Sequence, residues 1–205
     1  MSRPRTRSEL LKLRREIAAA SKGRDLLEGK LNALRVEFQK TMSLTVDIAE
    51  RVAGLAARAS YSLAVARAVD GYPALKSVSL ATRGEITVDM KVRTVMGVAL
   101  PEIGRKNLVR TVVSRGYSPT GVSSRIDDAA ERHEELLTAL IELAGVETRL
   151  RRLAREIQRT RRRVNALDNR VLPKLYSEKR SIQASLEERF REDIFRLKRL
   201  MKARG

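Results

Sequence analysis

Apolar residues recur every seven positions through the first third of the chain, from about Ser8 to Ala68. Two series interleave at steps of three and four, which is typical of a helix that presents one continuous apolar seam to a partner helix. Alanine becomes frequent from 49 to 68, so a partner could approach more closely there. The pattern predicts a long coiled-coil helix over residues 1–69. The seam positions are Leu13, Ala20, Leu27, Leu34, Thr41, Ile48 and Leu55, with Ile17, Arg24, Leu31, Phe38, Thr45, Val52 and Ala59.

A second seam of comparable length predicts a C-terminal helix over residues 123–205. Ser123 or Ser124, with Asp127 and Asp128 close behind, is a suitable helix start, because short polar side chains cap a helix and acids favour its N-terminus. The seam positions are Leu143, Leu150, Ile157, Val164 and Val171, with Val146, Leu153, Thr160 and Leu167.

The spacing of the second seam changes after Pro173. Steps of four become frequent, and such steps unwind a left-handed supercoil, while an interior proline bends a helix. We therefore expect a distortion near Leu172 to Leu175. The apolar positions beyond it are Leu175, Ile182, Leu186, Phe190, Ile194 and Leu197.

The middle of the chain, residues 70–122, breaks the heptad pattern. Asp70-Gly71 and Pro73 are expected to stop the first helix. The stretch 85–93 then alternates apolar and polar residues as a half-buried strand does, and 94–103 is a second extended stretch, with Gly97 as a candidate bulge and Pro101 near its end. We expect a small β-hairpin followed by an irregular loop through Gly121.

The two seams can satisfy each other as an antiparallel pair. The predicted fold is therefore mainly α: a long antiparallel two-helix coiled coil formed by the N- and C-terminal helices, with a small β-hairpin and loop inserted in the middle. With Leu10 near Leu197, the arginine-rich stretch 149–163 would face roughly residues 44–58.

The composition supports an elongated helical chain and suggests a polyanionic partner. Aromatic residues make up 3% of the 205 residues and cysteine is absent, which leaves little material for a conventional core and excludes disulfide and thiolate metal sites. The net charge of +18 suits nucleic acid, an anionic membrane surface or an acidic protein. No apolar run is long enough to span a bilayer, so we expect a soluble, cytoplasmic chain.

Candidate chemistry along the chain is weak. "GRDLLEGK", from Gly23 to Lys30, has the wrong glycine spacing for a phosphate loop and lies within the heptads, where small residues let helices approach. His133 is the only histidine and cannot by itself form a multi-histidine metal site. Acidic pairs such as Glu187-Glu188 suit surface charges near basic residues. We expect no catalytic, cofactor-binding or metal-binding residue and no enzymatic activity intrinsic to the chain.

The arginine-rich stretch "RLRRLAREIQRTRRR" is the strongest argument for nucleic acid. Its eight arginines lie between the seam residues Leu150, Leu153, Ile157 and Val164, so they coat the outside of the helix pair. A basic zipper instead places its basic region ahead of the heptads, and aromatic residues for stacking on bases are few. A basic coiled-coil nucleic-acid binder stays the main alternative and a membrane-associated scaffold the third, although neither needs a hairpin between two matched seams.

Several segments resemble the D subunit, the central rotor shaft of the V-type ATPases and A-type ATP synthases. They are "RTRSELLKLRREI" (Arg5 to Ile17), "KGRDLLEGKLNALRVEF" (Lys22 to Phe38), "VMGVALPEI" (Val95 to Ile103) and "ETRLRRLAREIQRTRRRVNALDNRVLPKL" (Glu147 to Leu175). The most specific part is Arg163-Val-Asn-Ala-Leu167 with Pro173 six residues on. Asp168 stands where the family pattern suggests Glu. The chain ends soon after its last heptads, which suggests a bacterial or archaeal source.

The resemblance implies a non-catalytic rotor subunit that transmits torque between ATP hydrolysis or synthesis and proton or sodium transport. The implied partners are the catalytic A and B subunits of the hexamer, the F subunit, and the membrane-proximal funnel subunit (C or d), without dedicated nucleic-acid binding or direct membrane insertion. The implied location is the cytoplasmic side of a membrane, as a peripheral part of a membrane-bound complex. We expect partner contacts at Arg5, Arg7, Arg14, Arg15, Arg163, Asn165, Pro173, Arg196 and Arg199, and in the hairpin at Val95, Met96, Gly97 and Pro101.

Overall fold

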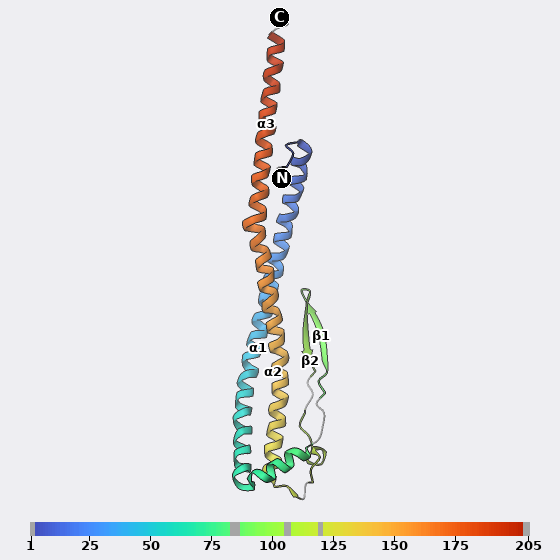
Figure 1. Cartoon of the computed structure of the whole chain (residues 1–205), viewed down its shortest axis with the longest axis vertical. Helices are drawn as coiled ribbons and strands as arrows, with labels where there is room; N and C mark the ends of the chain where they lie inside the picture. Colours follow the sequence, from blue (N-terminus) through green and yellow to red (C-terminus); the bar gives the residue numbers. More distant parts are fainter. Residues whose placement is uncertain (1–2, 83–86, 105–107, 119–120, 203–205) are drawn as a thin grey trace. The chain divides into compact units, whose positions relative to one another are not determined.

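The protein is mainly α-helical, with two long helical stretches that pack antiparallel and a β-hairpin inserted between them along the chain (Figure 1), as predicted. The computed structural model describes residues 3–82, 87–104, 108–118 and 121–202. Its elements, in order, are α1 (Arg7–Ala81), β1 (Met90–Val95), β2 (Val98–Ile103), the 3₁₀ turn η1 (Val112–Arg115), α2 (Ser124–Ala166), the π-helix η3 (Leu167–Val171) and α3 (Leu172–Lys202).

The chain forms two compact units. The first unit comprises Met1–Ala33 and Ile157–Gly205, and the second comprises Leu34–Glu156. Helices α1 and α2 contribute residues to both. Every seam position predicted along α1 is buried or half-buried, and so are those of α2 and η3 up to Leu167, which confirms the heptad assignment over these stretches.

In the first unit, the core is a cluster in which Leu13 and Ile17 of α1 meet Leu175 and Ile182 of α3. Leu10, Ala20 and Leu186 pack around this cluster. The predicted pairing of Leu10 with Leu197 is therefore wrong by more than one heptad, because Leu186 packs on this cluster and Leu197 is 60% exposed. The predicted seam members Phe190 and Ile194 are exposed as well.

The distortion predicted near Pro173 is a π-helix that lies one turn before the expected place, at Leu167–Val171. The N–H of Leu172 donates to the oxygen of Leu167, five residues back. Proline has no N–H to give to the carbonyl four residues before it, and its ring clashes with that carbonyl, so a wider turn is favoured there.

This π-helix accommodates one residue more than the heptad repeat would place there. A strict heptad after Val164 would bury Val171, as predicted, but Val171 is 39% exposed while Leu172 is buried. The five-residue turn shifts the buried series by one position, which brings Leu172, Leu175 and Ile182 onto the face that packs against α1.

In the second unit, small residues form the core between α1 and the start of α2. Ala66 packs with Ile126 and Ala129, and Ala59 is fully buried, which fits the close approach expected from the alanine-rich segment. Helix α2 begins at Ser124, as expected. The hydroxyl of Ser123 does not cap it but donates to Asp70 Oδ2 at 2.7 Å.

Helix α1 changes direction at Gly71, where a φ of 81° and a ψ of 160° interrupt the helix. A positive φ is readily adopted by glycine and is costly for other residues. The interruption was predicted, but the helical residues that follow it, with Pro73 in the first turn and an end at Ala81, were not. They cover Ala66 and Ile126 with Leu75 and Val78.

The hairpin consists of β1 and β2, paired antiparallel from Met90↔Ile103 to Val95↔Val98. Met96 and Gly97 both have positive φ, 50° and 79°, which is typical of a two-residue type I′ turn. Gly97 is therefore part of the turn, not a bulge, and the first strand extends to Val95. The predicted strand residues 85 and 86 lie outside the described part of the chain.

Strand β2 anchors the hairpin on α2 (Figure 1). Arg152 Nη1 donates to the oxygen of Ala99 at 2.8 Å. The side chain of Ile103 lies directly over Gly145, where a Cβ would come within 2.9 Å of Ile103 Cδ1. By contrast, Gly23 and Gly29 have no atom within 4 Å of an added Cβ, so the expected role of these two glycines in helix approach is wrong.

We predict that Gly145→Ala destabilises the second unit by about 1 kcal/mol, because the new methyl group must displace Ile103. Thermal unfolding measures the change, and faster amide exchange in β2 should accompany it. The matched control is Gly54→Ala on α1, whose Cβ meets only Arg58 Nη2 at 3.9 Å; it should stabilise by about 0.5–1 kcal/mol. Equal effects of the two changes would contradict this account.

We also predict that deletion of Asn169 together with Pro173→Ala leaves an uninterrupted α-helix and raises the free energy of unfolding by about 1–3 kcal/mol. The deletion removes the extra residue of the turn, so Leu172 and Leu175 keep their seam positions. Deletion of the exposed Arg162 is the control, since it rotates the seam downstream and should lower stability. Chemical denaturation compares the variants, and a less stable Asn169 variant would disprove the one-residue interpretation.

Candidate functional site

The cationic residues expected to contact partners lie exposed at the free ends of α1 and α3 in the first unit. Arg5 precedes α1, while Arg7, Arg14 and Arg15 lie on its first turns. Arg196 and Arg199 lie near the end of α3. Arg5 meets the opposite helix through its backbone, since Arg189 Nη1 donates to the oxygen of Arg5 at 3.3 Å. The charged ends of these side chains therefore face solvent.

An ion-pair cluster around Arg3 fixes the segment that precedes α1. The Arg3 guanidinium lies 3.3 Å from Glu9, 2.9 Å from Glu16 and 2.9 Å from Glu178 of α3. The hydrogen bond from Arg3 lowers the pKa of Glu16 below its ordinary value. Sequence reasoning missed this cluster, since Arg3 and Glu178 are far apart along the chain. The Thr6-x-x-Glu9 spacing signals only the start of α1, where Thr6 Oγ1 accepts from the Glu9 N–H.

The end of α3 carries an uncovered apolar surface. Figure 1 shows α3 continuing past the N-terminal end of α1 within the first unit. Phe190, Phe195, Leu197, Leu200 and Met201 are between 59% and 76% exposed. Because a single helix cannot bury its own apolar face, this surface, which we call the α3 tip, needs a partner.

Arg163, Asn165 and Pro173 are all exposed and flank the π-helix. Asp168 of the π-helix lies 3.8 Å from Arg24 of α1, so the acid that departs from the family pattern holds a cation across the helix pair. In the arginine-rich stretch, seven of the eight arginines are exposed and Arg149 is half-buried. The exposure of these side chains confirms that the arginines lie on the outside of their helix.

The hairpin residues expected at a partner surface differ in exposure. Met96 and Gly97 at the turn are exposed, Val95 is half-buried and Pro101 is buried. The structure therefore offers the turn, and not Pro101, for contact. Met90 and Val92 of β1 were predicted on the buried face of a half-buried strand, but they are exposed, at 63% and 61%, so that prediction of burial is wrong.

A buried ion-pair network ties the loop after the hairpin to α2. Arg115 and Glu134 are 2% and 7% exposed, and Arg115 Nη2 donates to Glu134 Oε2 at 3.1 Å. Arg110 adds its backbone N–H and its Nε, each 2.9 Å from Glu134. The Tyr117 hydroxyl donates to Asp127 Oδ1 at 2.5 Å. Single-sequence reasoning had no signal for this network, because no spacing rule joins a loop arginine to a distant glutamate.

The network changes the pKa of its members in opposite directions. Burial raises the pKa of Glu134, but hydrogen bonds from Arg115 and Arg110 outweigh it, and the pKa falls below its ordinary value. Burial, followed by the hydrogen bond to Asp127, raises the pKa of Tyr117. Both groups are thereby held in the protonation state of neutral pH, which is the behaviour of a structural network.

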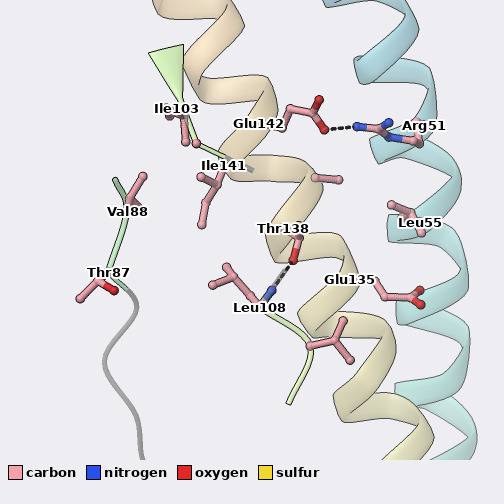
Figure 2. A pocket seen from close by; sticks show the side chains of 13 residues that line it. Arg51, Leu55, Thr87, Val88, Ile103, Leu108, Glu135, Thr138, Ile141 and Glu142 are labelled. Atoms are coloured by element: carbon pink, nitrogen blue, oxygen red, sulfur yellow. Dashed lines mark hydrogen bonds and ion pairs between the residues drawn. The ribbon is translucent and has the colours of Figure 1, made fainter. Parts of the chain in front are cut away.

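A cavity of about 510 Å³ lies between the base of the hairpin and the two helices of the second unit (Figure 2). Arg51 and Glu142 form an ion pair on one side. Thr138 Oγ1 accepts from the Leu108 N–H at 3.3 Å and donates to the backbone carbonyl oxygen of Glu134. The hydroxyl is therefore not an available nucleophile. His133, outside this cavity, hydrogen-bonds locally to the Ala129 oxygen through Nδ1. Over the residues that the structure describes, no cluster of metal ligands is found.

Among the described residues, no helix is both long and apolar enough to cross a bilayer.

The chain is similar to known proteins over nearly its whole length. The family model for the D subunit of ATP synthase matches residues 9–202. The D subunit of the A-type ATP synthase of Archaeoglobus fulgidus is 40% identical over 196 residues, which cover 95% of this chain and 94% of that protein. The D subunit of the V-type ATP synthase of an Anaeromyxobacter species is 42% identical over 196 residues, covering 96% of this chain and 91% of that protein.

An antiparallel helix pair with a small hairpin, exposed charges and an uncovered apolar helix end is typical of a component of a larger assembly. The chain belongs to the D-subunit family of the A/V-type ATP synthases, whose members are the non-catalytic central-stalk rotor subunits.

We predict that Glu134→Gln lowers the free energy of unfolding by about 2 kcal/mol at pH 7, because a charged acceptor buried beside Arg115 is lost. The folded pKa is depressed, so the stabilisation is present above the ordinary value of 4.5 and is lost as the pH falls through the folded pKa. The difference between variant and wild type should shrink in acid. Glu135→Gln, at a less buried neighbour, should have little effect. A pH-independent difference in denaturation would contradict this assignment.

Proposed function

We propose that the chain transmits torque between a catalytic hexamer of A and B subunits and a membrane ring that carries protons or sodium ions. The α3 tip carries this proposal: it is an apolar helix end with Arg196, Lys198, Arg199 and Lys202 around it, and α1 does not cover it. Such an end suits insertion into the central cavity of a ring of subunits, where apolar contacts replace the missing partner helix.

The seams suit the transmission of torque. Many small packing contacts distributed along a two-helix interface resist shear together, although each contact is weak. The exposed arginines suit a surface that changes partners during rotation, because solvent-exposed ion pairs contribute only about 0–1 kcal/mol each and can re-form. We infer that Arg5, Arg7, Arg14, Arg15, Arg196 and Arg199 meet acidic surfaces of the hexamer.

The region of Pro173 is proposed to set how the shaft meets the catalytic subunits. The π-helix supports this, because it changes the helix geometry between Arg163 and Pro173, and such turns are frequent at functional sites. Arg163 and Asn165 are exposed beside it and are proposed as contacts. A structural role limited to the seam is the alternative, and normal rotation of a Pro173→Ala variant would favour it.

The remaining partners are proposed from the family. The F subunit is placed along the helix pair, with the hairpin turn at Met96 and Gly97 as a contact, and the funnel subunit (C or d) is placed at the membrane-proximal end. The proposed location is the cytoplasmic side of the membrane, as a peripheral component of the complex. The exposed hairpin turn supports a protein contact there.

Replacement of Arg5, Arg7, Arg14, Arg15, Arg196 and Arg199 by Gln tests the charge contribution. We expect hexamer affinity to fall by about tenfold or more at low salt, and the fall to vanish at high salt, because screening removes surface attractions. The matched control replaces six other exposed arginines, five of the arginine-rich stretch and one of the π-helix, namely Arg151, Arg155, Arg159, Arg161, Arg162 and Arg170. Unchanged affinity of the first variant across the salt series would disprove the charge contribution, and retention of nucleic acid at high salt in place of protein partners would favour the alternative function.

A further inference from the structure

The two edges of the hairpin differ in what covers them. On β2, the backbone oxygen of Ala99 accepts a hydrogen bond from Arg152, Pro101 has no N–H, and the side chain of Ile103 packs on Gly145. On β1, no further strand follows in the described chain, since the sheet has two strands. One edge is therefore blocked by α2 and by proline, whereas the other is open.

The register identifies which backbone groups of β1 are open. The Gly104 N–H donates to the oxygen of Asp89 at 2.9 Å, so the backbone groups of Asp89 point toward β2. Backbone direction alternates along an antiparallel strand, so Lys91 and Arg93 also pair with β2. The N–H and C=O groups of Met90, Val92 and Thr94 consequently point away from the hairpin.

The side chains of β1 give this edge two different faces. Met90 and Val92 are 63% and 61% exposed and lie on one face, after Val88 at 45%. Lys91 and Arg93 are exposed on the other face, and Arg93 has Glu102 at 3.7 Å. The edge thus combines open hydrogen-bonding groups, an apolar row and two cations.

We propose that β1 is a docking edge for a β-strand of another subunit of the complex, which adds to the hairpin as a third strand. The incoming strand would pair with the backbone of Met90, Val92 and Thr94, place apolar side chains beside Met90 and Val92, and place carboxylates beside Lys91 and Arg93. The inference rests on the proposed function, because it takes the partner from the same assembly.

Charge argues against a second copy of this chain as the occupant. In an antiparallel pairing of two β1 strands centred on Val92, Lys91 of each copy would lie opposite Arg93 of the other. Like charges directly opposite each other destabilise a strand pair, so the two cations discourage self-association and favour an acidic strand.

Residue-resolved amide exchange tests the docking edge, on the isolated chain and on the complex reconstituted with the remaining purified subunits. In the isolated chain, the amides of Met90, Val92 and Thr94 should exchange freely while those of Lys91, Arg93 and Val95 are protected. In the complex, the first three should slow by about tenfold or more. Unchanged exchange of these three in an assembled complex overturns the inference alone, whereas failure to assemble overturns the proposed function as well.

Two variants of the docking edge, one control variant and one measurement of size complete the test. Val92→Glu should weaken assembly by about tenfold, whereas Val113→Glu, at a residue that is 80% exposed outside the hairpin, should leave it within about twofold. Lys91→Glu with Arg93→Glu should weaken assembly most at low salt. Sedimentation of the isolated chain should give a monomer, and a dimer with protected β1 amides would replace the proposed partner by a second copy.

Discussion

The apolar seam between antiparallel helices is the interaction on which the rest of the structure depends. A chain with 3% aromatic residues and no cysteine cannot build a large core, so its stability must come from many small contacts in series. In the first unit these contacts join Leu13 and Ile17 to Leu175 and Ile182, and in the second they join Ala66 to Ile126 and Ala129. Because apolar side chains fill the seam, nearly all charged side chains can lie at the surface.

The seam also decides what the sequence could predict. Heptad spacing predicted positions that are buried or half-buried along α1 and, from Leu143 to Leu167, along α2 and η3, because a helix that packs along one stripe repeats its burial with a fixed period. It did not predict the buried Ile126, Ala129 and Glu134 at the start of α2. It could not predict the register, since apolar residues recur along both helices and several alignments satisfy them equally. Ion pairs such as that of Arg24 with Asp168 select among these alignments, and they join residues too distant for any spacing rule.

The candidate surfaces were predictable in kind, but their exact residues were not. Exposure of the terminal arginines followed from their positions outside the seam. Sequence alone extended the seam through Phe190 and Leu197, although α1 offers no partner there, so an exposed apolar surface was mistaken for core. In the hairpin, alternation identified the strands, but the turn at Met96 was missed because a methionine with a φ of 50° is an uncommon choice for that conformation.

The π-helix at Leu167–Val171 has a consequence for how such chains vary in length. A wide turn can take up one inserted residue locally, and every later residue then returns to its former neighbour across the helix pair. Relatives that lack one residue between Ala166 and Leu172 could therefore keep the same partners through an ordinary α-helix. A single-residue gap at this place in an alignment would then record a difference in turn width, with no change in the protein's architecture.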